Sequence, residues 1–139
     1  MNLENIDKLC RHLENLPEGD RFDWTNYGHK SNCGTTACVA GWAYIILGGD
    51  LESASNLEII TAARKWLDLT DSQARLLFLP INTLNRYLYT KFEQDIDFIS
   101  NLFSIYRQTS IMCILNNNSK NIVKLIRAYV KKWQNEVLV

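Results

Sequence analysis

The sequence predicts an all-α fold, a single compact domain of five to six helices with a long irregular loop after the first helix. Three observations support this prediction: apolar residues recur at helical spacing, capping residues precede several of these segments, and 139 residues fit one domain. The composition, 47% hydrophobic and 22% charged, is typical of a globular chain and excludes a disordered one.

The first helix is expected over residues 3–16, where apolar side chains recur every three or four positions. Asn2 is its expected N-cap, and Pro17 is expected to end it. The next stretch, residues 17–34, contains three glycines and large rings at Phe22, Trp24 and Tyr27. Loops of this length are uncommon in compact domains and often have a function, so we expect an irregular functional loop here.

The second helix is expected to begin near Thr35 and to end at the Gly48-Gly49 pair. Later helices are marked by capping boxes, in which a Ser or Thr precedes a Glu or Gln by three residues: Ser55 with Glu58, Thr70 with Gln73 and Thr90 with Glu93. The second box opens a short helix that ends before Pro80, and Ser119 caps the last helix. Residues 109–115 form a short apolar run that fits either a strand or a helix.

The formal charge is unevenly distributed along the chain. Residues 1–60 carry nine acids against four bases, and residues 61–139 carry six acids against eleven bases, so that the whole chain is neutral. A dedicated nucleic-acid binder has an excess of basic charge, and the sequence therefore makes nucleic acid an unlikely partner.

The longest apolar run, residues 38–47, is about ten residues long, which is too short to span a bilayer. No signal-peptide pattern is found at the start of the chain. We therefore expect a cytoplasmic protein without a membrane partner, in which the four cysteines are reduced thiols or metal ligands.

Residues 22–47 stand out, and the first chemistry that they suggest is metal binding. His29, Cys33 and Cys38 are soft ligands within ten residues, a set that suits Zn²⁺. A closed structural site needs a fourth ligand, for which four residues are candidates: Cys10, His12, Asp20 and Asp23. The spacing is not the paired C-x2-C of zinc modules, and without zinc we expect no cofactor.

The second chemistry is nucleophilic catalysis by Cys33. If Thr35 or Thr36 caps the second helix, Cys33 lies just before its N-terminus, where the helix dipole lowers a thiol pKa. His29 would then act as the base and Asp23 would orient it, as in a catalytic triad.

The third possibility is a ligand pocket at the same helix start. Rings at Trp24, Tyr27 and Trp42 are suited to stacking on a base, and backbone N–H groups at Thr35 and Thr36 are suited to holding a phosphate. The simplest interpretation is nevertheless structural, because cysteines and aromatic rings are among the residues most often buried.

Three groups of residues resemble a family of small uncharacterised proteins found in bacteria and their phages: Phe22-Asp23 with Trp24, Cys33-Gly34-Thr35-x-Ala37-Cys38-x-Ala40-Gly41-Trp42-Ala43, and Leu67-x-Leu69-Thr70-x-x-Gln73-Ala74-x-x-Leu77-Phe78. The resemblance covers roughly residues 6–80 and implies a fold and a bacterial or phage setting. His29 does not match the family pattern. Within a single domain of residues 1–139, we expect residues 1–80 to be a family-like core and residues 81–139 a C-terminal helical elaboration.

The last helix carries a basic face. Its members recur at helical spacing and form one stripe: Lys120, Lys124, Arg127 and Lys131. Such a stripe is able to bind phosphates or an acidic protein, but an ordinary solvated helix face has the same pattern and is the favoured interpretation.

Taken together, these features predict a non-enzymatic helical binding protein with its contact site in residues 22–47. The resemblance favours a phage-related accessory factor that binds a host protein or a nucleotide ligand. The alternatives are a cysteine-dependent enzyme using Cys33 and a small structural zinc-binding protein.

Overall fold

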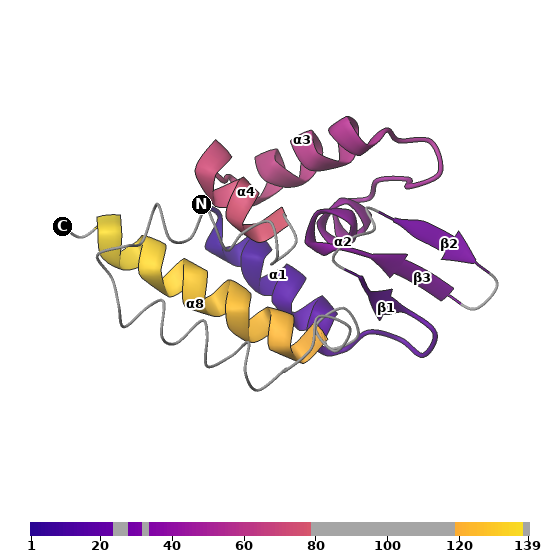
Figure 1. Ribbon diagram of the computed structural model, residues 1–139, viewed down its shortest axis with the longest axis horizontal. Coiled ribbons are helices and arrows are strands. Elements are labelled where there is room, and N and C mark those ends of the chain that lie inside the picture. Colours follow the sequence, from indigo (N-terminus) through magenta and orange to yellow (C-terminus); the bar gives the residue numbers. More distant parts are fainter. Residues whose placement is uncertain (24–27, 32–33, 79–118, 138–139) are drawn as a thin grey trace.

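The computed structural model describes residues 1–23, 28–31, 34–78 and 119–137. The described elements follow one another in this order (Figure 1): α1 (Leu3–Glu14), β1 (Arg21–Phe22), β2 (His29–Ser31), β3 (Gly34–Ala37), α2 (Val39–Ile46), α3 (Asn56–Leu67), α4 (Asp71–Phe78) and α8 (Ser119–Val137). The predominantly helical class is confirmed. The helix predicted after Thr90 and the ambiguous residues 109–115 lie outside the described residues.

The prediction of an all-α fold with an irregular loop is wrong, because the predicted loop and the predicted start of the second helix together contain a three-stranded sheet in the order β1-β3-β2. Strand β1 runs parallel to β3, with Arg21 opposite Thr36, and β2 runs antiparallel to β3, with His29 opposite the same threonine. The strands have only two to four residues each, so none shows the apolar alternation that reveals a strand in a sequence.

The start of the second helix also differs from its prediction. Thr35 and Thr36 do not cap it, since both belong to β3, and the N-cap is Cys38. The predicted end is correct: the helix stops at Ile46, Leu47 is the C-cap, and Gly48 follows with a φ of 100°.

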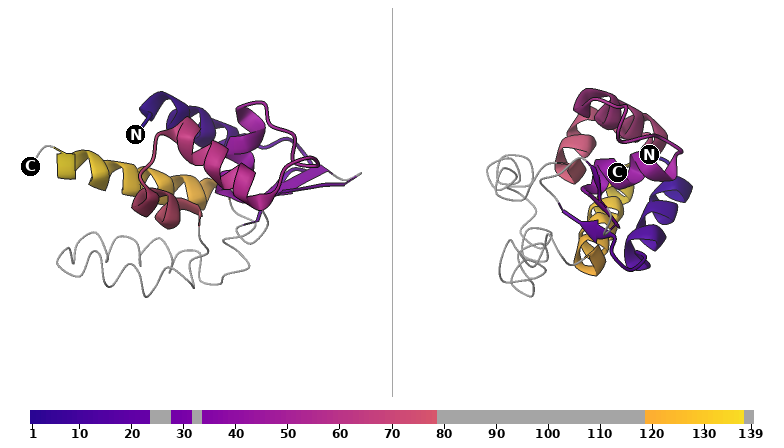
Figure 2. Two further views of the ribbon diagram at one scale, coloured as in Figure 1. Left: turned by 90° about the horizontal axis from the view of Figure 1, so that it is seen from above. Right: turned by 90° about the vertical axis from the view of Figure 1, so that its right-hand side faces the viewer.

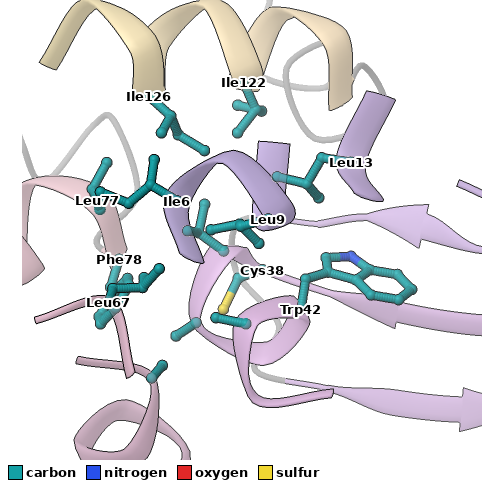
Figure 3. Packing of buried hydrophobic residues seen from close by; sticks show 14 of the residues in the cluster. Ile6, Leu9, Leu13, Cys38, Trp42, Leu67, Leu77, Phe78, Ile122 and Ile126 are labelled. Atoms are coloured by element: carbon teal, nitrogen blue, oxygen red, sulfur yellow. The ribbon is translucent and has the colours of Figure 1, made fainter. Parts of the chain in front are cut away.

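Helix α2 lies at the centre of the described structure. It contacts α1, α3, α4 and β3, and its first five residues, Val39 to Ala43, are all buried. Figure 3 shows Leu9 of α1 and Leu67 of α3 near the start of α2, whereas Ile126 of α8 belongs to the same hydrophobic cluster on the other side of α1. Helix α8 packs along α1 (Figure 1), and the sheet projects from one end of the helical body (Figure 2).

Three of the predicted caps are confirmed. Ser119, predicted to cap the last helix, is instead the first residue of α8. Asn2 accepts a hydrogen bond of 3.0 Å from the N–H of Asn5, and Ser55 accepts one of 3.2 Å from the N–H of Glu58. Thr70 and Gln73 form the reciprocal pair, with bonds of 3.2 and 3.0 Å. Each cap satisfies helix N–H groups that have no partner inside the helix.

Candidate functional site

Trp42 is a core residue in this structure and does not line an open ligand pocket. Its side chain is 1% exposed, and its Nε1 donates a hydrogen bond of 3.1 Å to the backbone carbonyl of Arg21 in β1. The His12 ring of α1 lies against it, with centroids 5.1 Å apart. Figure 3 shows the indole directed towards the strands. Trp42 therefore joins α2 to β1 and α1, and a ligand base cannot stack on it.

The predicted phosphate cradle at Thr35 and Thr36 is not formed, because these residues pair in a sheet instead of opening a helix. The N–H of Thr35 donates to Oδ1 of Asp20 at 2.8 Å, so this amide already has a partner. Trp24 and Tyr27, the other residues assigned to this pocket, lie outside the described residues.

The thiol at the N-terminus of α2 belongs to Cys38, whereas Cys33 was predicted to lie next to the helix and is outside the described residues. Burial raises the pKa of the Cys38 thiol to about 11, and the backbone N–H groups of Gly41 and Ala40 lower it only in part. Burial likewise raises the pKa of Cys10 to about 11, against the opposing effect of the Arg127 charge. Both thiols stay protonated at neutral pH and are poor nucleophiles.

Both thiols are expected to resist alkylation by iodoacetamide in the folded protein at about pH 8. A pKa of about 11 instead of 9.0 leaves roughly a hundredfold less thiolate, and the burial of Cys10 and Cys38 also limits access. The reaction is expected to accelerate as the pH approaches the raised pKa. Peptide mass spectrometry measures the modification at each site, with the chain unfolded in guanidinium as the control. Equal rates at about pH 8 in the folded and unfolded protein would contradict the burial of these thiols.

The remaining members of the predicted catalytic and metal sets are separated by the sheet. His29 is in β2, and Asp23 extends β1 on the other side of β3, where its N–H donates to the Ala37 carbonyl at 2.9 Å. Two strand spacings, about 10 Å, thus lie between their backbones. Among the residues that the structure describes, no three His, Cys, Asp or Glu side chains gather in a way that could hold a metal ion.

The predicted basic face is exposed at Lys120, Lys124 and Lys131. Its fourth member, Arg127, turns towards α1 instead: its Nη2 lies 3.5 Å from Oδ1 of Asp7 and 3.5 Å from Oε1 of Glu14. The stripe is therefore interrupted by an arginine that helps to dock α8 on α1.

A groove that the sequence analysis did not identify lies between α3 and α4. We call it the α3–α4 groove. It has a volume of about 280 Å³ and is lined by eight residues: Leu57, Ile60, Thr61, Arg64, Asp71, Ala74, Arg75 and Phe78. Ala74 and Phe78, 5% and 4% exposed, form an apolar floor, whereas Leu57 on the rim is 74% exposed. The sequence did contain a signal, because Leu57 and Ile60 lie off the stripe of Ile59, Ala63 and Leu67 that faces the core.

Two arginines determine the charge of the groove. Nη1 of Arg64 pairs with Oδ1 of Asp71 at 2.6 Å, which links the two helices, and Nε of Arg64 donates to the Leu69 carbonyl at 3.1 Å. Within the described ranges Arg75 has no ion-pair partner, and its side chain is exposed. The groove thus combines an apolar floor with one uncompensated positive charge on its wall.

Comparison of the chain with protein-family models, curated proteins and solved structures finds no match in any of the three. The resemblance to the bacterial and phage family accordingly stays a prediction. None of the helices in the described ranges is long and apolar enough to cross a membrane.

Proposed function

We propose that this protein is a non-enzymatic binding protein that holds a partner protein in the α3–α4 groove. The observation that carries the proposal is the groove itself, in which an exposed leucine stands beside a buried apolar floor. An apolar groove rimmed by polar side chains is the kind of surface at which proteins bind partners, since covering apolar surface that water would otherwise contact releases free energy.

The side chains that line the groove favour recognition over catalysis. The polar ones are two arginines, one threonine and an aspartate held in an ion pair, and none is a thiol or an imidazole. Such groups orient a partner by charge and hydrogen bonds. The proposed contact site therefore moves from residues 22–47 to α3 and α4. A phage-related accessory role towards a host protein remains part of the proposal and rests on the motif resemblance alone.

Selection from a displayed library of random peptides, long enough for several helical turns, tests the proposal. Selected peptides are expected to bind the wild-type protein and to lose affinity about tenfold or more on Leu57→Asp, which places a charge on the apolar rim. Fluorescence anisotropy measures the affinities. Leu3→Asp is the matched control, because Leu3 is also exposed and also lies in the first turn of its helix.

Two results would reject the groove as the contact site. One is a selection that yields no peptide binding the folded protein. The other is a set of peptides whose affinity falls equally with Leu57→Asp and Leu3→Asp, since that would show a loss unrelated to the groove.

A further inference from the structure

The shape of the α3–α4 groove indicates what kind of segment fits it. Each helix contributes residues at positions i, i+3, i+4 and i+7: Leu57, Ile60, Thr61 and Arg64 from α3, and Asp71, Ala74, Arg75 and Phe78 from α4. This spacing places the residues of each helix on one face over two turns, a length of about 10 Å. Helices pack by setting the side-chain ridge of one into the groove on another, so the paired faces of α3 and α4 offer a surface of the kind that a third helix packs on.

The size of the groove favours side chains over a whole ligand. Its volume of about 280 Å³ lies at the lower limit for small-molecule sites, which run from roughly 300 to 1,000 Å³. A few apolar side chains spaced by one helical turn, entering between Leu57 and Phe78, fit this space. A nucleotide would in addition need a stacking ring, and none of the lining residues except the buried Phe78 is aromatic.

The charge of the groove indicates the sign of the partner. Arg64 and Asp71 neutralise each other at 2.6 Å, so the net charge of the wall comes from Arg75. Nε and Nη1 of Arg64 are already engaged, with the Leu69 carbonyl and with Asp71, so Arg75 is the arginine of the groove without an ion-pair partner in the described ranges. Arginine pairs with carboxylates in a defined bidentate geometry, whereas a basic segment would be repelled.

We infer that the groove binds an acidic amphipathic helix of a partner protein, whose apolar side chains lie on Ala74 and Phe78 and whose carboxylate pairs with Arg75. This inference rests on the proposed function and specifies the partner's chemistry. It is the helix-in-groove mode of recognition, in which residues one turn apart supply the apolar contacts and a charge fixes the orientation.

Charge reversal on both sides of the interface tests the inference. Arg75→Glu is expected to weaken binding of the selected acidic peptides by about tenfold or more, and a Glu→Lys change in the peptide is expected to restore binding to this variant. Lys65→Glu is the matched control. This substitution in α3 changes the net charge by the same amount as Arg75→Glu, but Lys65 is exposed and does not line the groove. Circular dichroism of the complex is expected to show helix formation in the peptide.

The outcomes separate this inference from the proposed function. Some peptides could depend on Leu57 but lose no more affinity with Arg75→Glu than with Lys65→Glu. That result would reject the inference that the partner helix is acidic and would leave the groove as the contact site. Selected peptides that bind in an extended conformation, or that are basic, would overturn it in the same way. Peptides indifferent to Leu57→Asp would reject the proposed function itself.

Discussion

Replacing Trp42 with alanine is expected to lower the free energy of unfolding by roughly 3 to 5 kcal/mol, the usual cost of removing a fully buried aromatic side chain. The ring is 1% exposed at the meeting point of α1, α2 and β1, so its removal leaves a cavity that three elements line. The variant also leaves the Arg21 carbonyl without its donor at 3.1 Å. Urea denaturation followed by circular dichroism measures the loss.

Trp42→Phe is the matched control for this prediction. It keeps an aromatic ring but removes the Nε1 donor and part of the volume, so we expect a smaller loss of about 1 to 3 kcal/mol. Should Trp42→Ala leave the unfolding free energy nearly unchanged while abolishing binding, the ring would be a contact residue, as the sequence first suggested, and its place in the core would be wrong.

Replacing Gly34 with alanine is expected to destabilise the protein by about 2 to 6 kcal/mol, through two effects that add. Gly34 has a φ of +128°, which side chains rarely adopt and which costs about 1 to 3 kcal/mol. A Cβ there would also meet the backbone carbonyl of Gly19, and backbone cannot move aside as a flexible side chain can, so overpacking adds about 1 to 3 kcal/mol.

Gly48→Ala separates the two effects. Gly48 also has a positive φ, +100°, but a Cβ on it would meet nothing within 4 Å. We therefore expect a loss of only about 1 to 2 kcal/mol from backbone strain. Thermal and urea denaturation of both variants provide the comparison. Equal losses for Gly34→Ala and Gly48→Ala would show that the close approach of Gly19 contributes nothing.

The helices were predictable because their signals are local. The N-caps Asn2, Ser55 and Thr70 each bond an N–H only three residues away, and such short-range contacts are visible in a sequence. The sheet was not predictable from the sequence. Strand β1 pairs with β3 across fifteen positions, with Arg21 opposite Thr36, and the strands of this sheet are too short to show alternating apolar residues. Its threonines were consequently taken for a helix cap.

Those members of the predicted site that the structure describes differ from their prediction for a related reason. Residues such as Cys38 and Trp42 are chemically distinctive, and a sequence shows that chemistry without showing what covers it. In the structure α1, α3 and α4 pack around α2, and this burial raises the thiol pKa and encloses the ring. The α3–α4 groove, by contrast, is lined by no cysteine, histidine or tryptophan that would draw attention in a sequence. It forms because α3 and α4 pack side by side, and the sequence does not show how these two helices are placed.

By itself, the sequence determined where the described helices α1, α3 and α4 begin and that the chain is predominantly helical, because capping and apolar spacing act over three or four residues. The tertiary structure decided which of the distinctive residues are buried, where the strands pair, and where an apolar groove forms between two helices. These outcomes depend on contacts between segments far apart in the chain, and their free energy is set by packing that no single segment encodes.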